Sequence, residues 1–296
     1  MSNSGKASAS ADIKGANAGV KDRIILTTER VLCYIVLILI TFLCLFSFYV
    51  LIINTTRSHP DIQKGFSFLP GKSFIVNMKN VLANENIPVI KGMFNSLFVA
   101  ACSAVLSVYF SALTAFAIHA YNFRLKKFAF TFILLVMMVP TQVSALGFVK
   151  MIGDWKLLNS YIPLIVPSIA APVVFFFIKQ YMDSVLPMEL IEAARIDGAN
   201  QFQIYWKIFM PIMKPSLILV GVLNMLTVWN DYLGPLIFLQ DRSKYTLALG
   251  LASFKGVHST QIIPMLCITI IMIIPPIIIF IIAQKYIVEG TSGSIK

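Results

Sequence analysis

The sequence predicts an all-α membrane protein with six transmembrane helices. Of its 296 residues, 58% are hydrophobic and only 12% are charged, whereas soluble domains are about 45–50% apolar and about 25% charged. Six apolar runs have the roughly 17–25 residues that a helix needs to cross the hydrocarbon core. Because these runs lack the period-2 alternation of barrel strands, helices are the expected membrane-spanning structure.

The six expected spans follow one another from residue 31 onward. Residues 1–30 are rich in Ser, Ala, Gly, Asn and Lys, a composition that buries too little apolar surface to fold, and they are expected to form a mobile cytoplasmic tail. No small-residue cleavage pattern follows the first run, so we expect an uncleaved span rather than a signal peptide. The spans are expected at 31–53, 95–120, 128–149, 161–178, 216–239 and 262–283.

Lysine and arginine are slightly more frequent in the segments that lie inside when the N-terminus is cytoplasmic. This bias favours an N-in, C-in orientation. The expected domains are the tail, a first helix with an external loop (31–94), a five-helix core (95–284) and a cytoplasmic C-terminal tail (285–296). Within the core, 180–215 is the longest internal segment, and residues 245–250 favour a short external helix.

Charge and motifs exclude several classes of protein. The net charge of +11 comes from lysines and arginines scattered over every loop, not gathered as in a nucleic-acid-binding face. Gly65 and Gly71 resemble the ends of a phosphate-binding loop, but five residues separate them and Pro70 removes an amide. The four cysteines lie inside expected spans and form no metal-binding pattern. No catalytic motif is found, so a non-enzymatic chain without a cofactor or metal of its own is expected.

The internal segment 180–215 predicts a helix–turn–helix. Asp183 or Ser184 is expected to cap a helix that has Pro187 in its first turn and ends near Ile196. The next two residues, Asp197-Gly198, predict a turn, because Gly198 accepts the left-handed conformation at little cost.

A second helix is expected over about 200–210, with Pro211 and Pro215 interrupting it. The first helix would expose the small side chains of Ala193 and Ala194 beside Glu192, a surface that another protein's backbone can approach closely. The alternative is an amphipathic hairpin lying on the membrane surface.

The spacing of several residues along the same segment resembles a known family signature. Glu192-Ala193-Ala194, Gly198 and the run ending at Pro211 resemble the EAA signature of ABC importer permeases, and the surrounding sequence is similar to the carbohydrate, MalG-like branch. Further similar segments are 140–142, 187–199, 229–231, 246–256 and 284–290. The resemblance covers residues 95 to the C-terminus.

The resemblance implies both partners and a mechanism. It implies a heterodimer with a homologous permease, two cytoplasmic ATPases that bind ATP and Mg, and an extracytoplasmic sugar-binding protein. ATP-driven closure of the ATPases would move the permease pair between inward- and outward-facing states. The coupling residues implied are Glu192, Ala193, Ala194, Arg195, Asp197, Gly198 and Pro211, with a weaker C-terminal ATPase contact at Glu289 and Gly290.

The fifth expected span contains the only acidic residue within the spans, Asp231. An ionisable residue inside a membrane span indicates function by default, yet Asp231 lies about 22 Å along the helix, near the external mouth. A structural or vestibule-lining role is therefore favoured over sugar binding. Candidates for the pathway or for helix pairing are Asn224, Trp229, Asn230, Asp231 and Tyr232.

The function expected is ATP-driven import of a sugar or oligosaccharide across a prokaryotic cytoplasmic membrane, with this chain as a permease subunit. Two alternatives remain open: a permease of the same type for a non-sugar solute, and an ion-coupled secondary carrier that acts alone.

Overall fold

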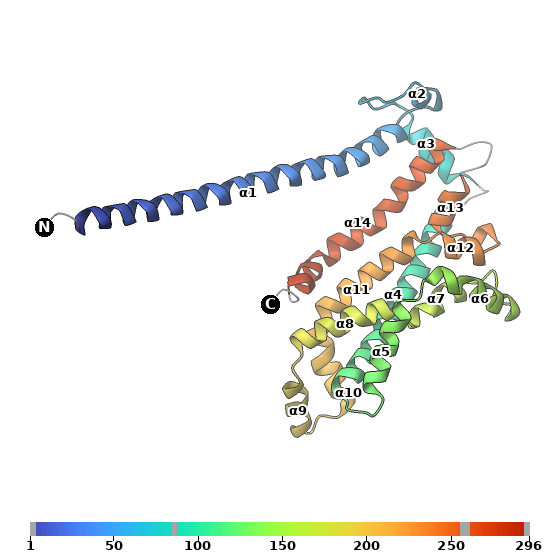
Figure 1. Ribbon diagram of the computed structural model, residues 1–296. Coiled ribbons are helices and arrows are strands. Elements are labelled where there is room, and N and C mark those ends of the chain that lie inside the picture. Colours follow the sequence, from blue (N-terminus) through green and yellow to red (C-terminus); the bar gives the residue numbers. More distant parts are fainter. Residues whose placement is uncertain (1–3, 85–87, 255–260, 293–296) are drawn as a thin grey trace. The chain divides into compact units, whose positions relative to one another are not determined.

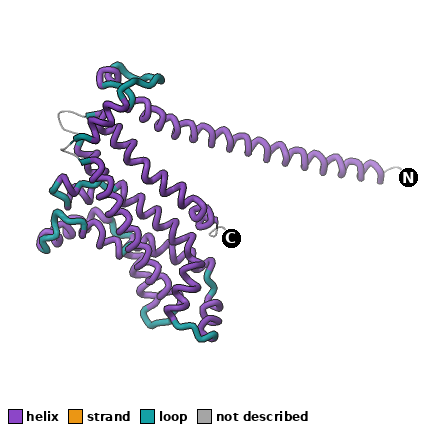
Figure 2. Tube along the Cα trace, turned by 180° about the vertical axis from the view of Figure 1, so that it is seen from behind, coloured by secondary structure: helices purple, strands orange, loops and turns teal. Residues whose placement is uncertain are grey.

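The computed structural model describes residues 4–84, 88–254 and 261–292, and every regular element in these ranges is helical. Loops lie mostly at the ends of the helices (Figure 2). The predicted all-α fold is confirmed. The chain divides into two compact units, Met1–Lys72 and Ser73–Lys296, which are described separately.

The first unit contains α1 (Ser4–Thr55) and α2 (His59–Gln63). The predicted first span lies within α1, and the expected tail has a helical backbone from Ser4 onward, while its mobility stays a prediction. The loop after α1 is packed around the buried Arg57, whose Nη1 donates to the carbonyl oxygen of Gly65 at 2.8 Å. Phe66 and Phe68 stack edge to face beside Phe46. This part of the external loop is therefore folded.

The second unit is a bundle of long helices joined by short ones (Figure 1). In chain order its helices are α3 (Phe74–Leu82), α4 (Val89–Ala120), α5 (Lys126–Met137), α6 (Thr141–Asp154), α7 (Ile162–Ile165), η1 (Val166–Ile169), α8 (Pro172–Val185), α9 (Met188–Ile196), α10 (Gln201–Ile204), η2 (Tyr205–Phe209), α11 (Met210–Asn230), α12 (Leu233–Phe238), η3 (Arg242–Lys244), α13 (Leu247–Ser253) and α14 (Ile262–Ser292).

Five helical stretches within the described residues are long and apolar enough to cross a membrane. Each overlaps one of the predicted runs, so a span at those five places is confirmed. The stretches are Glu29–Thr55, Val89–Ala120, Ile162–Val185, Gln201–Asn230 and Ile262–Val288. The run 216–239 is nevertheless not one helix, because α11 ends at Asn230 and α12 begins at Leu233.

The remaining predicted run, 128–149, is divided between two helices, so the prediction of one continuous helix there is wrong. Pro140 has extended backbone angles, φ −61° and ψ 127°, and separates α5 from α6. A proline lacks an N–H and disfavours helical geometry in the residue before it. The 12 residues of α5 are about 18 Å long, shorter than a hydrocarbon core of about 30 Å.

The helix that follows the internal turn continues past its prolines, so the predicted interruption is also wrong. α10 runs through the π-helical η2 into α11. The N–H of Met210 donates to the carbonyl oxygen of Tyr205, five residues back. Because Pro211 has no N–H to donate, it is accommodated in the first turn after this wider segment. Pro215 lies inside α11 without ending it.

The centre of the bundle is α4, which packs against α8 and α11. Its buried face consists mostly of small side chains, and small residues let membrane helices approach closely. Phe116 of α4 joins Ile178 of α8 and Phe209 of η2 in one apolar cluster. The small residues are Gly92, Ser96, Ala100, Ser103, Ala104, Ser107, Ser111, Ala112, Ala115 and Ala120.

At the other end of α4, hydrogen bonds attach the segment that joins α11 to α14. Asn95 Nδ2 donates to the carbonyl oxygens of Ser243 and Tyr245 at 3.1 and 3.0 Å. The hydroxyl of Ser96 accepts the N–H of Leu247 at 2.7 Å, and α13 confirms the short helix predicted there. The segment between α11 and α14 is therefore anchored to the N-terminal end of α4.

Candidate functional site

The internal segment forms a hairpin of α9 and α10, residues 188–204, called the internal hairpin below. α8 extends to Val185, and Pro187 is the residue before α9, with φ −65° and ψ 147° and no side-chain cap. The prediction that Asp183 or Ser184 caps this helix is therefore wrong. The Asp183 carboxylate instead accepts hydrogen bonds from Lys179, within α8. The predicted end of the helix at Ile196 is confirmed.

The turn of the internal hairpin is a Schellman motif. The N–H of Gly198 donates to the carbonyl oxygen of Arg195 at 3.1 Å, and that of Ala199 donates to Ala194 at 3.0 Å. Gly198 has φ +83°, the left-handed region that glycine accepts without a Cβ penalty. The predicted role of this glycine in the turn is confirmed.

Beyond the turn, α10 begins with a capping box. Asn200 Oδ1 accepts the N–H of Gln203 at 2.8 Å, and Gln203 Oε1 accepts the N–H of Asn200 at 2.9 Å. Two backbone N–H groups that a helix start leaves unpaired are thus satisfied. The sequence contains this signal as Asn-x-x-Gln, and it fixes where α10 starts.

The two faces of α9 differ from the expectation. Glu192 and Ala193 are exposed, but Ala194 is only 8% exposed and belongs to the apolar cluster around α4. The prediction that both alanines are exposed is therefore wrong for Ala194. Its small side chain lets α9 lie close to the core instead.

Two large apolar side chains stand out from the internal hairpin. Ile196 is 87% exposed and Phe202 is 71% exposed, one on each side of the turn. Large exposed apolar side chains on such a projecting hairpin indicate a surface that another protein covers. Sequence reading missed them, although an apolar residue directly before the Asp197-Gly198 turn was available as a signal.

Arg195 points inward and not to the exposed face. Its Nη2 donates to the carbonyl oxygen of Ala120 at 2.9 Å, and its guanidinium lies 5.8 Å from the centre of the Tyr121 ring. Asp197 and Pro211 are exposed. Behind the turn, an open hollow of about 410 Å³ is lined by Asp197, Gly198, Gln203 and Lys207, among others.

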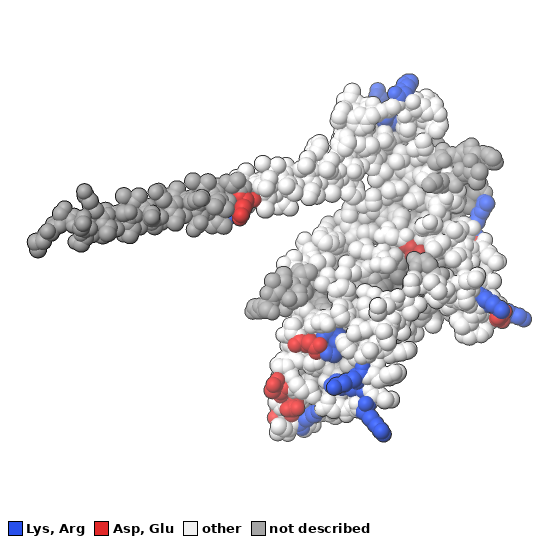
Figure 3. Space-filling view, in the orientation of Figure 1, with Lys and Arg blue, Asp and Glu red and all other residues white. Residues whose placement is uncertain are grey.

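Charged side chains gather around the internal hairpin. Figure 3 shows acidic and basic side chains at the end of the bundle where α9 and the last turns of α8 lie, whereas the middle of the bundle is almost free of charge. At this same end of the bundle, Lys214 of α11 lies 5.1 Å from the ring centre of Tyr286 near the end of α14. The predicted contact residues Glu289 and Gly290 follow, but their side chains lie outside the described residues.

A second group of candidates lies along α11. Asn224 and Thr227 line a hollow of about 320 Å³ between α8 and α11. Thr227 and Asp231 line another hollow, of about 210 Å³, beside Ser96 and Thr246. Asparagine, threonine and aspartate offer hydrogen-bond partners for an uncharged polar solute.

Asp231 also holds the break between α11 and α12. Its Oδ1 accepts the N–H of Leu233 at 3.0 Å and that of Gly234 at 3.3 Å. Its Oδ2 lies so close to Gly234 that a Cβ there would be 2.6 Å away. The carboxylate therefore has a structural role at the mouth of the second hollow.

The other candidates on α11 divide between the core and the surface. Trp229 is buried, and its Nε1 donates to the carbonyl oxygen of Met272 of α14 at 3.2 Å. Asn230 donates locally to the carbonyl oxygen of Leu226, and Tyr232 is half exposed. The structure thus makes Trp229 a helix-pairing residue and leaves Asn224 and Asp231 on the hollows.

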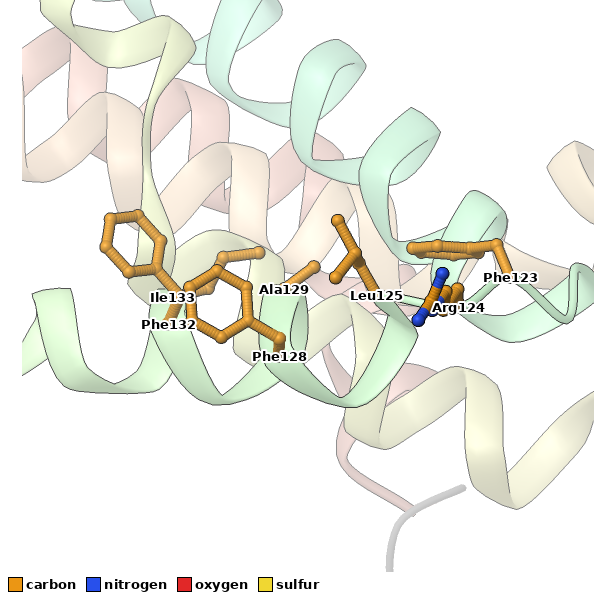
Figure 4. Close-up of a pocket in the computed structure, with 7 residues that line it drawn as sticks. All are labelled: Phe123, Arg124, Leu125, Phe128, Ala129, Phe132 and Ile133. Carbon is orange, nitrogen blue, oxygen red and sulfur yellow. The ribbon is translucent and has the colours of Figure 1, made fainter.

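A different hollow, of about 630 Å³, lies on α5 and is apolar. Figure 4 shows phenylalanine rings along one side of α5, with Arg124 at one end. Phe128 and Phe132 are more than half exposed. This is the chemistry of a surface that meets lipid or another membrane helix, not of a site for a polar solute. Its lining residues are Phe123, Arg124, Leu125, Phe128, Ala129, Phe132 and Ile133.

Comparison with known proteins gives one consistent result. Residues 107–292 match the family described as binding-protein-dependent transport system inner membrane component. The arabinooligosaccharides transport system permease protein AraQ of Halalkalibacterium halodurans is 35% identical over 203 residues, 68% of this chain and 72% of the relative.

A second relative acts on a different solute. The sn-glycerol-3-phosphate transport system permease protein UgpE of Yersinia pestis is 30% identical over 90% of this chain and 97% of its own length. Among solved structures, a bacterial ABC transporter involved in the import of the acidic polysaccharide alginate matches with a TM-score of 0.74 at 22% identity, over 88% of this chain and 97% of the other. This last likeness supports the fold.

Proposed function

Because the chain belongs to the family of binding-protein-dependent transport system inner membrane components, we propose that it is the permease subunit of an ATP-driven importer for a sugar or oligosaccharide. It is a multi-pass membrane permease of the ABC importer type. Transport would occur by alternating access, with the internal hairpin coupling the membrane helices to ATPase subunits.

The internal hairpin carries this proposal. It is a compact structure that follows the membrane-spanning stretch Ile162–Val185, and its second helix begins the stretch Gln201–Asn230. It presents exposed apolar and acidic side chains at its outer end. The proposed coupling surface consists of Glu192, Ala193, Asp197, Gly198, Ile196 and Phe202. Ala194 and Arg195 would support this surface from beneath, and Pro211 would fix the start of α11.

The partners follow from the same proposal. A homologous permease would complete the pathway as a heterodimer, two cytoplasmic ATPases would bind ATP and Mg, and an extracytoplasmic binding protein would deliver the solute. This chain would itself be non-catalytic and hold no cofactor. The relatives are transport permeases, which supports that division of labour.

The cytoplasmic membrane of a prokaryote is the proposed location. The relatives compared above come from bacteria. In this proposal α5 and α6 together form one crossing, so that four crossings precede the internal hairpin and two follow it. With the internal hairpin facing the cytoplasm, the N- and C-termini would then be cytoplasmic too.

A neutral carbohydrate suits the hollows along α11 better than an anion. Asn224, Thr227 and Asp231 line them, and the described residues that line either hollow include no lysine or arginine. A phosphate-bearing solute would meet the carboxylate of Asp231 without a compensating cation. The similarity to AraQ supports an oligosaccharide, whereas the similarity to UgpE keeps glycerol 3-phosphate as the second candidate.

A test needs the whole complex. The chain would be tagged, purified with its partners from its own membranes and reconstituted in liposomes with ATP inside. We expect uptake of labelled arabinotriose, or of another neutral oligosaccharide in a panel, and little uptake of glycerol 3-phosphate. ATP-dependent uptake of glycerol 3-phosphate alone would contradict the sugar assignment, and uptake by this chain without ATPases would favour the ion-coupled carrier.

A further inference from the structure

Three consecutive residues at the end of α4 contact the segment that leads into the internal hairpin and then its two helices. The first is His119, whose Nε2 lies 2.9 Å from the carbonyl oxygen of Leu186, in the junction between α8 and α9. Its Nδ1 lies 3.0 Å from Asp183 Oδ1. Both ring nitrogens therefore face oxygen atoms of the segment that leads into the hairpin.

The next two residues contact the two helices of the hairpin. The carbonyl oxygen of Ala120 accepts a hydrogen bond from Arg195 Nη2 of α9 at 2.9 Å. The hydroxyl of Tyr121 donates to Gln201 Oε1 of α10 at 2.9 Å, and the Tyr121 ring lies beneath the guanidinium of Arg195. Residues 119–121 thus hold the junction, α9 and α10 in turn.

Helix electrostatics explain why a cation belongs here. The last carbonyl oxygens of a helix have no partner within the helix, and the C-terminal end carries a partial negative charge. Arg195 satisfies one of these oxygens, on Ala120, and Lys126 Nζ lies 3.4 Å from that of His119. A hydrogen bond from a charged donor is stronger than a neutral one.

An apolar contact supports the polar ones. Phe116, one turn before Ala120, packs against Tyr205 and Phe209 of η2, with ring centres 5.3 and 5.0 Å apart. Phe116, Tyr205 and Phe209 are all buried. The last turn of α4 is therefore fastened to the hairpin and to the start of α11 on both its polar and its apolar sides.

We propose that this last turn of α4, residues 116–121, is the joint through which movement of the internal hairpin reaches the membrane core, with Arg195 as its positioning residue. α4 is the helix against which α8 and α11 both pack. The joint would make the hairpin and α4 move as one body, so that a displacement of α9 is not absorbed by the loops at residues 186–187 and 197–200. This proposal rests on the coupling role proposed above.

The assignment changes the role of Arg195. The family resemblance implies a contact with the ATPase, but the guanidinium is directed to Ala120 and Tyr121, and its Nε is buried. Docking of an ATPase would therefore depend on the outer residues Glu192 and Ile196. Arg195 would instead affect how far the membrane helices move once an ATPase has docked.

The experiment separates docking from transmission. The purified complex would carry this chain with its four native cysteines replaced by alanine and with Leu223→Cys on the exposed side of α11. The rate at which a charged thiol reagent labels Cys at this position would be measured with and without trapping by ATP and vanadate. Arg195→Met keeps the side-chain length and removes the donors, and Arg195→Lys restores one donor. Arg124→Met, an exposed arginine in the loop after α4, is the matched control.

We expect Arg195→Met to keep the ATPases bound while the ATP-dependent change in the labelling rate falls about tenfold, the scale of one hydrogen bond from a charged donor. Arg195→Lys is expected to recover part of the ATP-dependent change in labelling rate, and Arg124→Met is expected to keep all of it. Loss of bound ATPase in Arg195→Met, or an unchanged response, overturns the joint. If the complex with Arg195 intact shows no response to ATP, the proposed function itself fails.

A cross-link tests whether the joint opens during the cycle. In a chain without native cysteines and without the Leu223→Cys reporter, Tyr121→Cys and Gln201→Cys would be bridged by a short bis-methanethiosulfonate, whose disulfide links a reductant cleaves, and ATP-driven uptake would be the response. If the joint stays closed throughout the cycle, the bridged complex responds to ATP as the unbridged one does. Loss of the response on bridging, reversed by reductant, would show that the joint opens and would overturn the proposal.

Discussion

Replacement of Gly198 by valine tests the turn of the internal hairpin. Gly198 has φ +83° and a Cβ added there meets no atom within 4 Å, so the cost is conformational and not steric. For an L-residue the left-handed region costs about 1–2 kcal/mol, and a β-branched side chain lies at the upper end. About 2 kcal/mol corresponds to a roughly 30-fold loss in an equilibrium constant.

If the Schellman turn presents the coupling surface, this cost appears in binding of the ATPase. We expect Gly198→Val to weaken ATPase binding by about 10- to 30-fold, measured by titration of purified ATPase onto the permease pair. Gly198→Asn is expected to stay near wild type, because asparagine tolerates the left-handed region.

A matched control uses the other described glycine with positive φ and open surroundings. Gly65 has φ +102° and also meets nothing within 4 Å. Gly65→Val therefore carries the same backbone cost in the loop after α1, and it should leave ATPase binding unchanged. Normal ATPase binding by Gly198→Val, or an equal loss with Gly65→Val, would refute the reasoning.

Three further predictions concern separate parts of the second unit. Asp231→Ala removes the acceptor for two N–H groups and should lower the free energy of unfolding by about 1 kcal/mol, whereas Asp231→Asn should lower it less. Thermal unfolding in detergent checks both variants, and equal effects would contradict a capping role. Ile196→Ser should weaken ATPase binding about tenfold or more, while Leu146→Ser, equally exposed on α6, should not. The pKa of Asp241 is lowered by the hydrogen bonds that its carboxylate accepts from Ser243. Its stabilising contribution is therefore complete above the ordinary pKa of an aspartate and is lost as the pH falls through the lowered pKa. The protection factor for amide exchange at Ser243, which corrects for the intrinsic pH dependence of exchange, should fall only in that acidic range.

Much of the fold follows from simple features of the sequence. Five of the six apolar runs correspond to spanning stretches, because length and hydropathy decide membrane insertion. The turn at Gly198 was predictable, since a glycine after a helix end has a specific conformational advantage. These features are local, and local chemistry is enough to fix them.

Other features depend on packing and were not predictable. Pro140 breaks a helix, whereas Pro211 is accommodated beside a π-helical segment; the residue type is the same, and only the neighbouring turns differ. Ala194 and Arg195 were expected at the exposed face, but α9 is nine residues long, and composition does not tell which side of so short a helix meets the core. The partner of Arg195 is a backbone carbonyl 75 residues away, which leaves no trace in the sequence around it.

The candidate site, too, was predictable only in part. The coupling segment was located by its motif, but the outward direction of Ile196 and Phe202 is known from their exposed fractions, 87% and 71%. Along α11, Trp229 was a pathway candidate by residue type, and its hydrogen bond to Met272 makes it a core residue. Motif spacing locates a segment, whereas the direction of each side chain requires the packed structure.

The most direct test of the account is uptake into liposomes that contain either this chain with all its partners or the permease pair without ATPases. With ATP inside and binding protein outside, the complete complex should accumulate a neutral oligosaccharide, and the pair alone should accumulate none, even with a proton or sodium gradient. Uptake driven by an ion gradient in the absence of ATPases would contradict the central claim.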